Sequence, residues 1–252
     1  MRLSVVIIAK NEAACIARCL ESVSWADEII VLDSGSTDDT VNISKQFTEH
    51  VYQTDWPGYG PQKNRALQRA SGDWVLSLDA DEWITPQLQQ EIAKVIAAPG
   101  EHSGFRVPRR SSFCGREMQH SGWWPDYVIR LFRRDRARFS DDVVHERVIV
   151  DGSIGALTSP IRHETFVDLT DLLEKMDSYS TLSAQRMYDD GRRASLTVAV
   201  LKSMWAFFRS YVLRRGFLDG HEGFMLAVST AEGTYYRYAK CLLLEKRGRS
   251  KQ

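Results

Sequence analysis

The sequence predicts an α/β protein with a mostly parallel sheet, followed by a helical C-terminal extension. Strand-like and helix-like segments alternate through the first hundred residues, which is typical of a parallel sheet covered by helices. The first run, Leu3–Ala9, is continuously apolar, as expected of a strand that is buried on both faces. Beyond Asp168 the apolar residues recur at helical spacing, so the last third of the chain is expected to be helical.

Turn and capping residues delimit the individual elements in chain order. Strands are expected at Leu3–Ala9, Glu28–Asp33, His50–Gln53 and Trp74–Leu78. Helices are expected from a cap at Asn11, over Gln62–Ala70 before Gly72, and from Pro86 to about Ala98. Short strands at 105–108, 128–132 and 147–150 are followed by helices over 168–188, 196–213 and 224–244. We therefore predict one domain over residues 1–165, with halves 1–100 and 101–165, and a helical extension over 166–252.

Charge is unevenly distributed, although the chain carries 33 basic and 33 acidic residues. Residues 192–252 hold 12 Lys and Arg against 4 Asp and Glu, so an acidic domain precedes a basic extension. The zero net charge argues against a nucleic-acid partner. Cys15 and Cys19 are expected to pack on one helix face and to be free thiols, as in a reducing cytoplasm.

Acidic residues follow two of the expected strands, where open parallel sheets bind their ligands. Asp33 ends one strand and could accept hydrogen bonds from a ribose or uracil, or it could simply cap the following turn. Asp79 and Asp81 follow the buried run Trp74–Leu78 with one small residue between them. Paired carboxylates suit Mg²⁺ or Mn²⁺ that also binds substrate phosphates, whereas a solvated acidic loop is the alternative.

Four motifs in order resemble family-two inverting glycosyltransferases of the GT-A fold, a Rossmann-like, mostly parallel architecture. They are Lys10-Asn11-Glu12, Val31-Leu32-Asp33-Ser34-Gly35-Ser36-Thr37-Asp38, Lys63-Asn64-Arg65-Ala66 and Leu78-Asp79-Ala80-Asp81-Glu82. The resemblance covers about residues 1–150. Together with Trp74 and a later Val144-His145-Glu146, the motifs look like those of bacterial lipopolysaccharide inner-core β-1,4-glucosyltransferases.

The resemblance implies a donor half at 1–100 and an acceptor half at 101–165. It places the nucleotide sugar against seven residues: Ala9, Asn11, Glu12, Asp33, Lys63, Asn64 and Asp79. It also implies a divalent cation, Mg²⁺ or Mn²⁺, held directly by Asp81, which would offset the charge on the departing diphosphate.

An inverting transfer needs a base that removes the proton from the acceptor hydroxyl. The candidates are Glu146, which is favoured, and the preceding Asp141 and Asp142; His145 could assist or bind the metal or a phosphate. A surface pair at the start of a strand is the alternative interpretation of His145 and Glu146.

Nine arginines and two tryptophans fall within residues 106–138. Arginine forks match phosphates and tryptophan faces stack on sugars, so Trp123, Trp124 and Arg130 are expected to bind the acceptor. A solvated loop with core tryptophans is the alternative.

Leu196–Leu213 is apolar but contains Lys202 and Arg209, and arginine pairs flank it. It therefore predicts a helix lying on an anionic membrane surface rather than a transmembrane span, with burial against the domain as the alternative.

The sequence thus predicts a hexosyltransferase, with glucose moving from UDP-glucose to a heptose of the lipid A-core oligosaccharide. The expected location is the cytoplasmic face of the bacterial inner membrane. A transferase acting on polyprenyl phosphate or another glycan would share the donor motifs, and a non-catalytic carbohydrate-binding module is the alternative from a different class.

Overall fold

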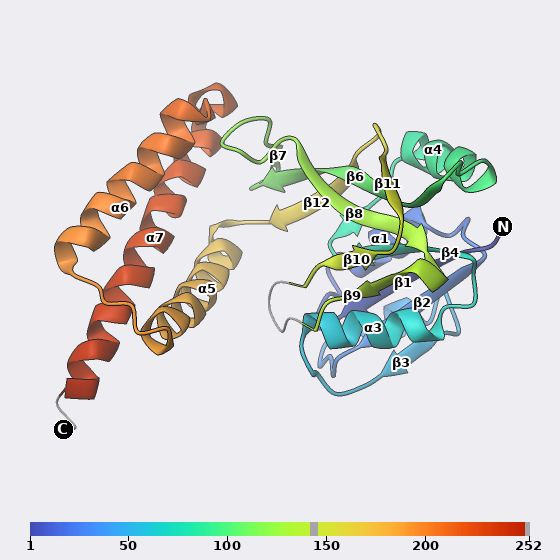
Figure 1. The fold of residues 1–252 in the computed structure, drawn as a ribbon, viewed down its shortest axis with the longest axis horizontal. Helices are drawn as coiled ribbons and strands as arrows, with labels where there is room; N and C mark the ends of the chain where they lie inside the picture. The colour runs from blue at the N-terminus through green and yellow to red at the C-terminus, as the bar shows by residue number, and fades with distance from the viewer. Residues whose placement is uncertain (142–145, 250–252) are drawn as a thin grey trace. The chain divides into compact units, whose positions relative to one another are not determined.

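The computed structural model describes residues 1–141 and 146–249 (Figure 1). The chain divides into two compact units. Unit 1 comprises Met1–Arg109 and Asp126–His163, and unit 2 comprises Arg110–Pro125 and Glu164–Gln252. We expected a boundary after residue 165 and placed residues 110–125 in the first domain, whereas in the structure they group with the C-terminal helices.

A mixed sheet forms the centre of unit 1 (Figure 1). Its parallel part has the order β3-β2-β1-β4, made of β1 (Leu3–Ala9), β2 (Glu28–Asp33), β3 (Val51–Gln53) and β4 (Trp74–Asp79). β8 (Asp126–Arg133) then pairs antiparallel with β4, and β6 (His102–Phe113) pairs antiparallel with β8. The sheet is therefore parallel from β3 to β4, whereas the pairs β4–β8 and β8–β6 are antiparallel.

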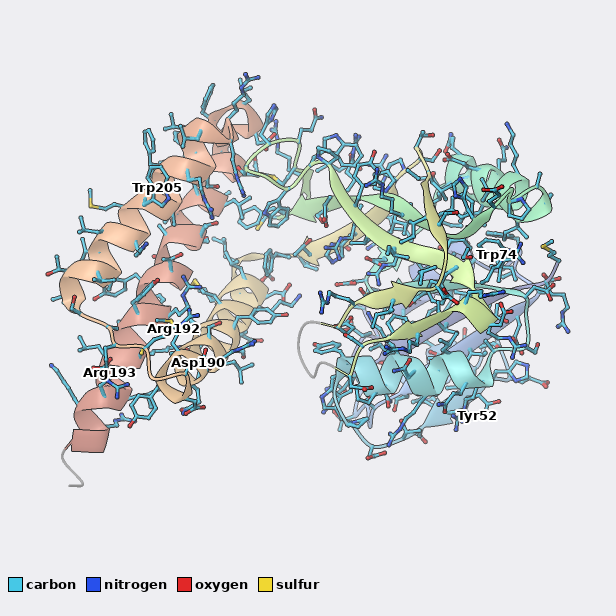
Figure 2. The ribbon with its side chains drawn as sticks, in the orientation of Figure 1. Tyr52, Trp74, Asp190, Arg192, Arg193 and Trp205 are labelled. Atoms are coloured by element: carbon cyan, nitrogen blue, oxygen red, sulfur yellow. The ribbon has the colours of Figure 1, made fainter. Side chains whose placement is uncertain are left out.

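Apolar residues cover both faces of the parallel strands, which explains their continuous hydrophobic runs. On one face, alternate residues of β1 and β4 pack with α1 (Ile16–Ser22) and α4 (Pro86–Ala97). On the other face, Val6 and Val75 pack with α3 (Tyr59–Arg69) and with β9 (Ala137–Phe139), which pairs antiparallel with β10 (Val148–Val150). The fully buried Trp74 begins β4 (Figure 2).

The shorter elements complete unit 1. They are α2 (Thr40–Ser44), β5 (Glu82–Trp83), the 3₁₀ turn η1 (Arg134–Arg136) and β11 (Ser153–Ala156). β12 (Ile161–Phe166) neighbours β6 and pairs antiparallel with β5, so His163 lies opposite Glu82. This pairing carries a residue from late in the chain to the segment that follows β4.

Asn11 does not cap a helix, and the expectation that it does is wrong. Its backbone is left-handed, with φ of 57°, and α1 begins five residues later at Ile16. The Asn11 side-chain oxygen instead accepts a hydrogen bond from the Thr37 backbone N–H at 2.8 Å. A tertiary contact to the loop after β2 has therefore replaced the local capping contact.

Unit 2 is mostly helical, as expected. Its helices are α5 (Leu169–Asp189), α6 (Leu196–Phe208) and α7 (Gly220–Arg249), with a π-helical turn η2 (Arg209–Leu213) and a 3₁₀ turn η3 (Gly216–Asp219) between the last two. The side chains of Asp168 and Ser195 cap α5 and α6 by accepting backbone N–H bonds. β7 (Arg116–Glu117) pairs with the end of β6, where Phe113 packs with Leu172 and Leu226.

Leu76 lies at the centre of β4 with no exposed surface. We expect Leu76→Ala to lower the free energy of unfolding by about 2–5 kcal/mol, because it removes buried methyl groups and leaves a cavity. Urea denaturation followed by far-UV circular dichroism measures this loss. The matched control is Ile149→Ala, at a strand position that is 41% exposed, and a similar loss in both variants would contradict the proposed core.

Candidate active site

The ends of β1, β2 and β4 bring the two acidic motifs to one edge of the sheet. In the register of the parallel strands, Ala9 lies opposite Asp33 and Ile8 lies opposite Asp79. The two aspartates therefore flank the end of β1, although 46 positions separate them in the chain. Their proximity follows from strand order, because successive parallel strands end on the same edge.

Asp33 is fully buried and organises the turn that follows β2. One carboxylate oxygen accepts the backbone N–H groups of Gly35 and Ser36 at 3.0 Å, and the other accepts the Ser36 hydroxyl. Gly35 suits this turn because its φ of 81° is unfavourable for other residues. The structure thus shows Asp33 capping its turn, and a contact with the donor stays a prediction.

Asn11 and Glu12 join the end of β1 to the same turn. The Asn11 backbone N–H donates to Ser36 Oγ at 2.8 Å, and the Glu12 backbone N–H donates to Thr40 Oγ1 at 2.8 Å. Ala9 contributes its carbonyl, which accepts the Ser34 backbone N–H at 2.9 Å. The predicted donor residues of β1 and β2 therefore form one connected loop pair.

Helix α3 places Lys63 against Asp79. The Lys63 side chain is 4% exposed, and its Nζ lies 2.8 Å from Asp79 Oδ1 and 2.7 Å from Glu146 Oε1. The preceding turn is anchored by Gln62, whose amide donates to Ser34 Oγ at 3.0 Å and to Thr54 Oγ1 at 2.7 Å. Lys63 thus connects the motif after β4 to the distant candidate base.

Arg130, on β8, binds the other side of Asp79. Its Nη2 donates to Asp79 Oδ2 and, at 2.7 Å, to Glu82 Oε1, whose side chain has no exposed surface. Glu82 Oε2 also accepts the Asp79 backbone N–H at 3.0 Å. Arg130 was predicted to bind the acceptor and falls in the strand expected at 128–132. In the structure it lies in that strand, and its side chain is buried between two carboxylates.

The pairs continue outward to Arg109 and Asp126. Arg109 Nη1 lies 3.5 Å from Glu82 Oε1, and its Nη2 lies 2.7 Å from Asp126 Oδ2. We call the whole row the ion-pair chain; in order it consists of Glu146, Lys63, Asp79, Arg130, Glu82, Arg109 and Asp126. Because the signs alternate along the row, each charge inside it has opposite charges on both sides.

The two cations set the protonation state of Asp79. Burial raises the pKa of this carboxyl, but the Arg130 guanidinium and the Lys63 ammonium outweigh burial and hold the pKa well below its usual range. Conversely, burial lowers the pKa of Arg130, while Asp79 and Glu82 together raise it above its usual value. Asp79 is therefore an ionised, fully paired carboxylate at neutral pH.

Asp81 lies outside the ion-pair chain and meets a histidine that the sequence analysis overlooked. Asp81 Oδ2 is 3.3 Å from His163 Nε2, and the two side chains are 28% and 13% exposed. In the described part of the chain, no three His, Cys, Asp or Glu residues converge as a complete metal site. A carboxylate and an imidazole still fit a divalent cation whose remaining ligands are substrate phosphate oxygens and water.

Three residues that were predicted to bind the donor or the acceptor contact other parts of the protein in the structure. Asn64 uses its amide on the Phe139 backbone, donating and accepting at 2.9 Å, so it holds β9 against α3. In unit 2, Trp123 packs edge-on against Phe113, and the Arg110 guanidinium lies 4.3 Å from the centre of the Trp124 ring. Asp142 and His145 lie outside the described residues.

Cys15 and Cys19 adjoin the acidic motifs. Burial raises the pKa of both thiols well above the usual value, and nearby carboxylates, Glu12 for Cys15 and Glu82 for Cys19, raise it further. All four cysteines are free, as expected. The two thiols therefore stay protonated at neutral pH, and Cys19 packs in the hydrophobic core.

The chain resembles known glycosyltransferases in sequence. Residues 4–153 match the glycosyl transferase family 2 model. A lipopolysaccharide core biosynthesis glycosyltransferase, LpsC of Rhizobium meliloti, is 31% identical over 94% of this chain and 93% of its own. An uncharacterised glycosyltransferase of Rickettsia felis is 32% identical over 95% of this chain and 89% of its own.

The match of the family model and these relatives show that the chain belongs to glycosyl transferase family 2 and is a glycosyltransferase. Among solved structures, S. aureus TarS residues 1–349 superpose with a TM-score of 0.50 at 17% identity, covering 100% of this chain and 92% of that one. This likeness concerns the fold, which is the expected GT-A fold with a C-terminal helical region.

The ion-pair chain predicts a specific dependence of stability on pH. The pKa of Asp79 is lower in the folded than in the unfolded chain, so its contribution is present above about pH 4 and is lost as pH falls further. We expect Asp79→Asn to be less stable than the wild type at pH 7 and the difference to shrink below about pH 4. Urea denaturation at several pH values measures it, and a constant difference would refute the pairing.

Proposed function

We propose that the protein is an inverting hexosyltransferase that moves glucose from UDP-glucose to a heptose of the lipopolysaccharide inner core. The observation that carries this proposal is the Asp81–His163 pair beside the ion-pair chain, at the edge of the sheet where β1, β2 and β4 end. That edge is the usual ligand-binding edge of an open α/β sheet.

The donor would lie across the ends of β1, β2 and β4. Asn11, Glu12 and the Asp33 turn form the nucleoside end of this surface, and Asp79 and Lys63 form the end nearest Asp81. Lys63 and Arg130 hold the Asp79 carboxylate in place, so its orientation is set before the donor binds. Preorganised charges of this kind contribute to catalysis without reorganising during the reaction.

Asp81, with His163 beside it, would hold a divalent cation, Mg²⁺ or Mn²⁺. When bound, the cation supplies positive charge that stabilises the departing diphosphate. Asp79 is already paired with two cationic side chains, which leaves Asp81 as the more available carboxylate of the motif.

Glu146 would act as the base that accepts the proton of the acceptor hydroxyl in a single displacement. Its Oε1 accepts a hydrogen bond from the Lys63 ammonium, and this bond fixes the carboxylate at the end of the ion-pair chain. Asp142 is the second candidate base. A single displacement by a positioned hydroxyl inverts the configuration at the sugar carbon, because no covalent intermediate forms.

The proposed acceptor rests on the relative named for lipopolysaccharide core biosynthesis, which matches along almost the whole chain. Trp123 and Trp124 remain proposed acceptor residues. Arg130 is buried against Asp79 and Glu82, so we propose that it positions these two carboxylates and does not itself contact the acceptor.

Unit 2 would hold the enzyme on the inner face of the bacterial inner membrane. By length and composition, Leu196–Leu213 is the one segment of the described chain that could cross a bilayer. It contains Lys202 and Arg209, which are costly at the centre of a membrane, so we propose that it lies in the interface with anionic lipid.

The cation site predicts the behaviour of two variants. We expect Asp81→Ala to slow Mn²⁺-dependent hydrolysis of UDP-glucose about 100-fold or more, because a bound metal contributes several kcal/mol to transition-state stabilisation. His163→Ala should raise the Mn²⁺ concentration for half-maximal rate by about 10- to 100-fold. Release of UDP measures both effects.

Asp135→Ala is the matched control, because this carboxylate in η1 is 74% exposed and pairs only weakly with Arg136 at 4.0 Å. Its hydrolysis rate should equal that of the wild type. Equal rates of UDP-glucose hydrolysis in Asp81→Ala and in the wild type would refute the proposed metal-assisted mechanism.

Mass spectrometry of lipopolysaccharide tests the acceptor. A strain lacking the protein should produce a core that is lighter by one hexose, and Glu146→Gln should fail to restore it. An unchanged core would exclude the heptose acceptor. If a polyprenyl-linked sugar were lost instead, the alternative acceptor would replace it.

A further inference from the structure

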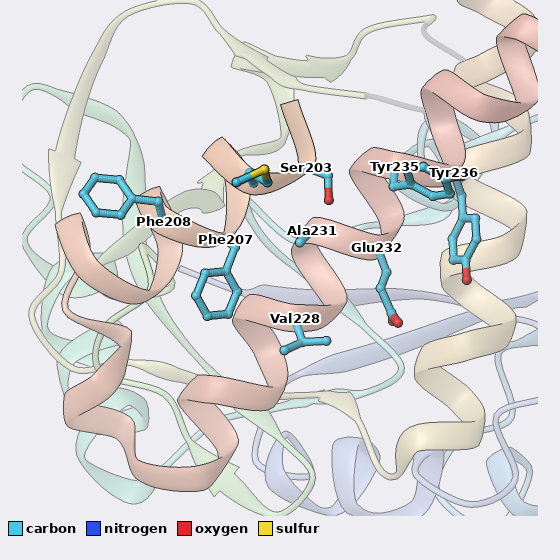
Figure 3. Close-up of a pocket in the computed structure, with 9 residues that line it drawn as sticks. Ser203, Phe207, Phe208, Val228, Ala231, Glu232, Tyr235 and Tyr236 are labelled. Carbon is cyan, nitrogen blue, oxygen red and sulfur yellow. The ribbon is translucent and has the colours of Figure 1, made fainter. Parts of the chain in front are cut away.

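A groove lies between α6 and α7 in unit 2 (Figure 3). Its volume is about 600 Å³, within the range of pockets that bury small ligands. Its walls are mostly apolar and include Met204, Phe207, Phe208, Val228, Ala231 and Tyr235. The groove can therefore accommodate a slender apolar ligand between two helices.

Other side chains of unit 2 pack against the residues that line the groove. The Phe207 ring lies 5.4 Å from the Tyr211 ring and 5.7 Å from the Phe224 ring, measured between centroids. These aromatic contacts hold Phe207 in place, while the small Ala231 leaves space on the α7 side (Figure 3). Met204 is flexible and adapts to the shape of an apolar partner.

The surface around the groove is also apolar and exposed. On α6, Leu201 is 60% exposed, Met204 64% and Trp205 52% (Figure 2). Only 17% of Leu196–Leu213 is buried, so this segment is not a core helix of its unit. Exposed apolar patches of this kind mark sites that bind a partner or a membrane.

The charges around this surface indicate what the partner is. Residues 192–215 contain six basic residues and no acidic residue: Arg192, Arg193, Lys202, Arg209, Arg214 and Arg215. All six side chains are exposed. An apolar segment with basic and no acidic residues complements a molecule that has both an apolar part and an anionic part, and an anionic phospholipid has this chemistry.

We propose that the groove between α6 and α7 takes one acyl chain of an anionic membrane phospholipid. The basic residues of segment 192–215 supply the positive charge that attracts the anionic headgroup. Among the described lining residues Glu232 is the only charged one, and its negative charge disfavours a phosphate in the groove itself (Figure 3). The inference deepens the proposed membrane association, because it adds a defined lipid site to a general affinity for the surface.

Titration of the full-length protein with cis-parinaric acid, a fluorescent fatty acid, tests the site. We expect one molecule to bind per chain, with Met204→Glu weakening binding tenfold or more. Leu201→Glu is the matched control, because Leu201 lies on the same helix outside the groove and is equally exposed. Both variants remove an apolar side chain and add one negative charge, so a general loss of membrane affinity affects them equally.

Ala231→Trp, which fills the groove without changing charge, should weaken parinaric acid binding to a similar extent. Circular dichroism confirms that each variant is folded. Equal affinity in Met204→Glu and Leu201→Glu, or no binding by the wild type, would overturn the proposal. Co-sedimentation with phosphatidylglycerol vesicles tests the membrane association separately. If the wild type binds parinaric acid in the groove but does not sediment with vesicles, the groove is an acyl-binding site and the proposed membrane association is refuted.

Discussion

The structure of the candidate site depends on the double pairing of Asp79 with Lys63 and Arg130. The three residues come from the end of β4, from α3 and from β8, so one carboxylate joins three parts of unit 1. Removing either cation would leave the partly buried Asp79 carboxylate with only one of its two partners, which is more costly than losing an exposed pair. The Asp79 side chain is therefore held in a fixed position at the ligand-binding edge of the sheet.

The same pairing distinguishes the surroundings of Asp79 from those of Asp81. Asp79 is neutralised by its neighbours and belongs to the ion-pair chain, whereas Asp81 points to His163. The two side chains reach different neighbours, because Ala80 separates them and β5 begins directly after Asp81. A carboxylate that is not already neutralised by two cations is the better ligand for a further cation.

Sequence patterns predicted best those features that depend on residues close together in the chain. The buried strands and the helix starting at Pro86 follow from apolar runs and from the fixed backbone of a proline in the first helical turn. The pattern failed at Asn11, where a hydrogen bond to Thr37 replaced the expected helix cap. Glu82 was noted only as part of the acidic motif, and Arg109 and Asp126 were not predicted to belong to the site, because single charged residues in strands carry no spacing signal.

What the amino-acid order determined by itself is the alternation of strands and helices, the acidic motifs at the strand ends and the basic, apolar C-terminal segment. Each of these depends on neighbours within a few residues. Only the tertiary structure decided that β12 pairs with β5, which brings His163 to Asp81 across 82 positions, and that β8 buries Arg130 beside Asp79. Such contacts depend on strand pairing between distant segments, which no local pattern specifies.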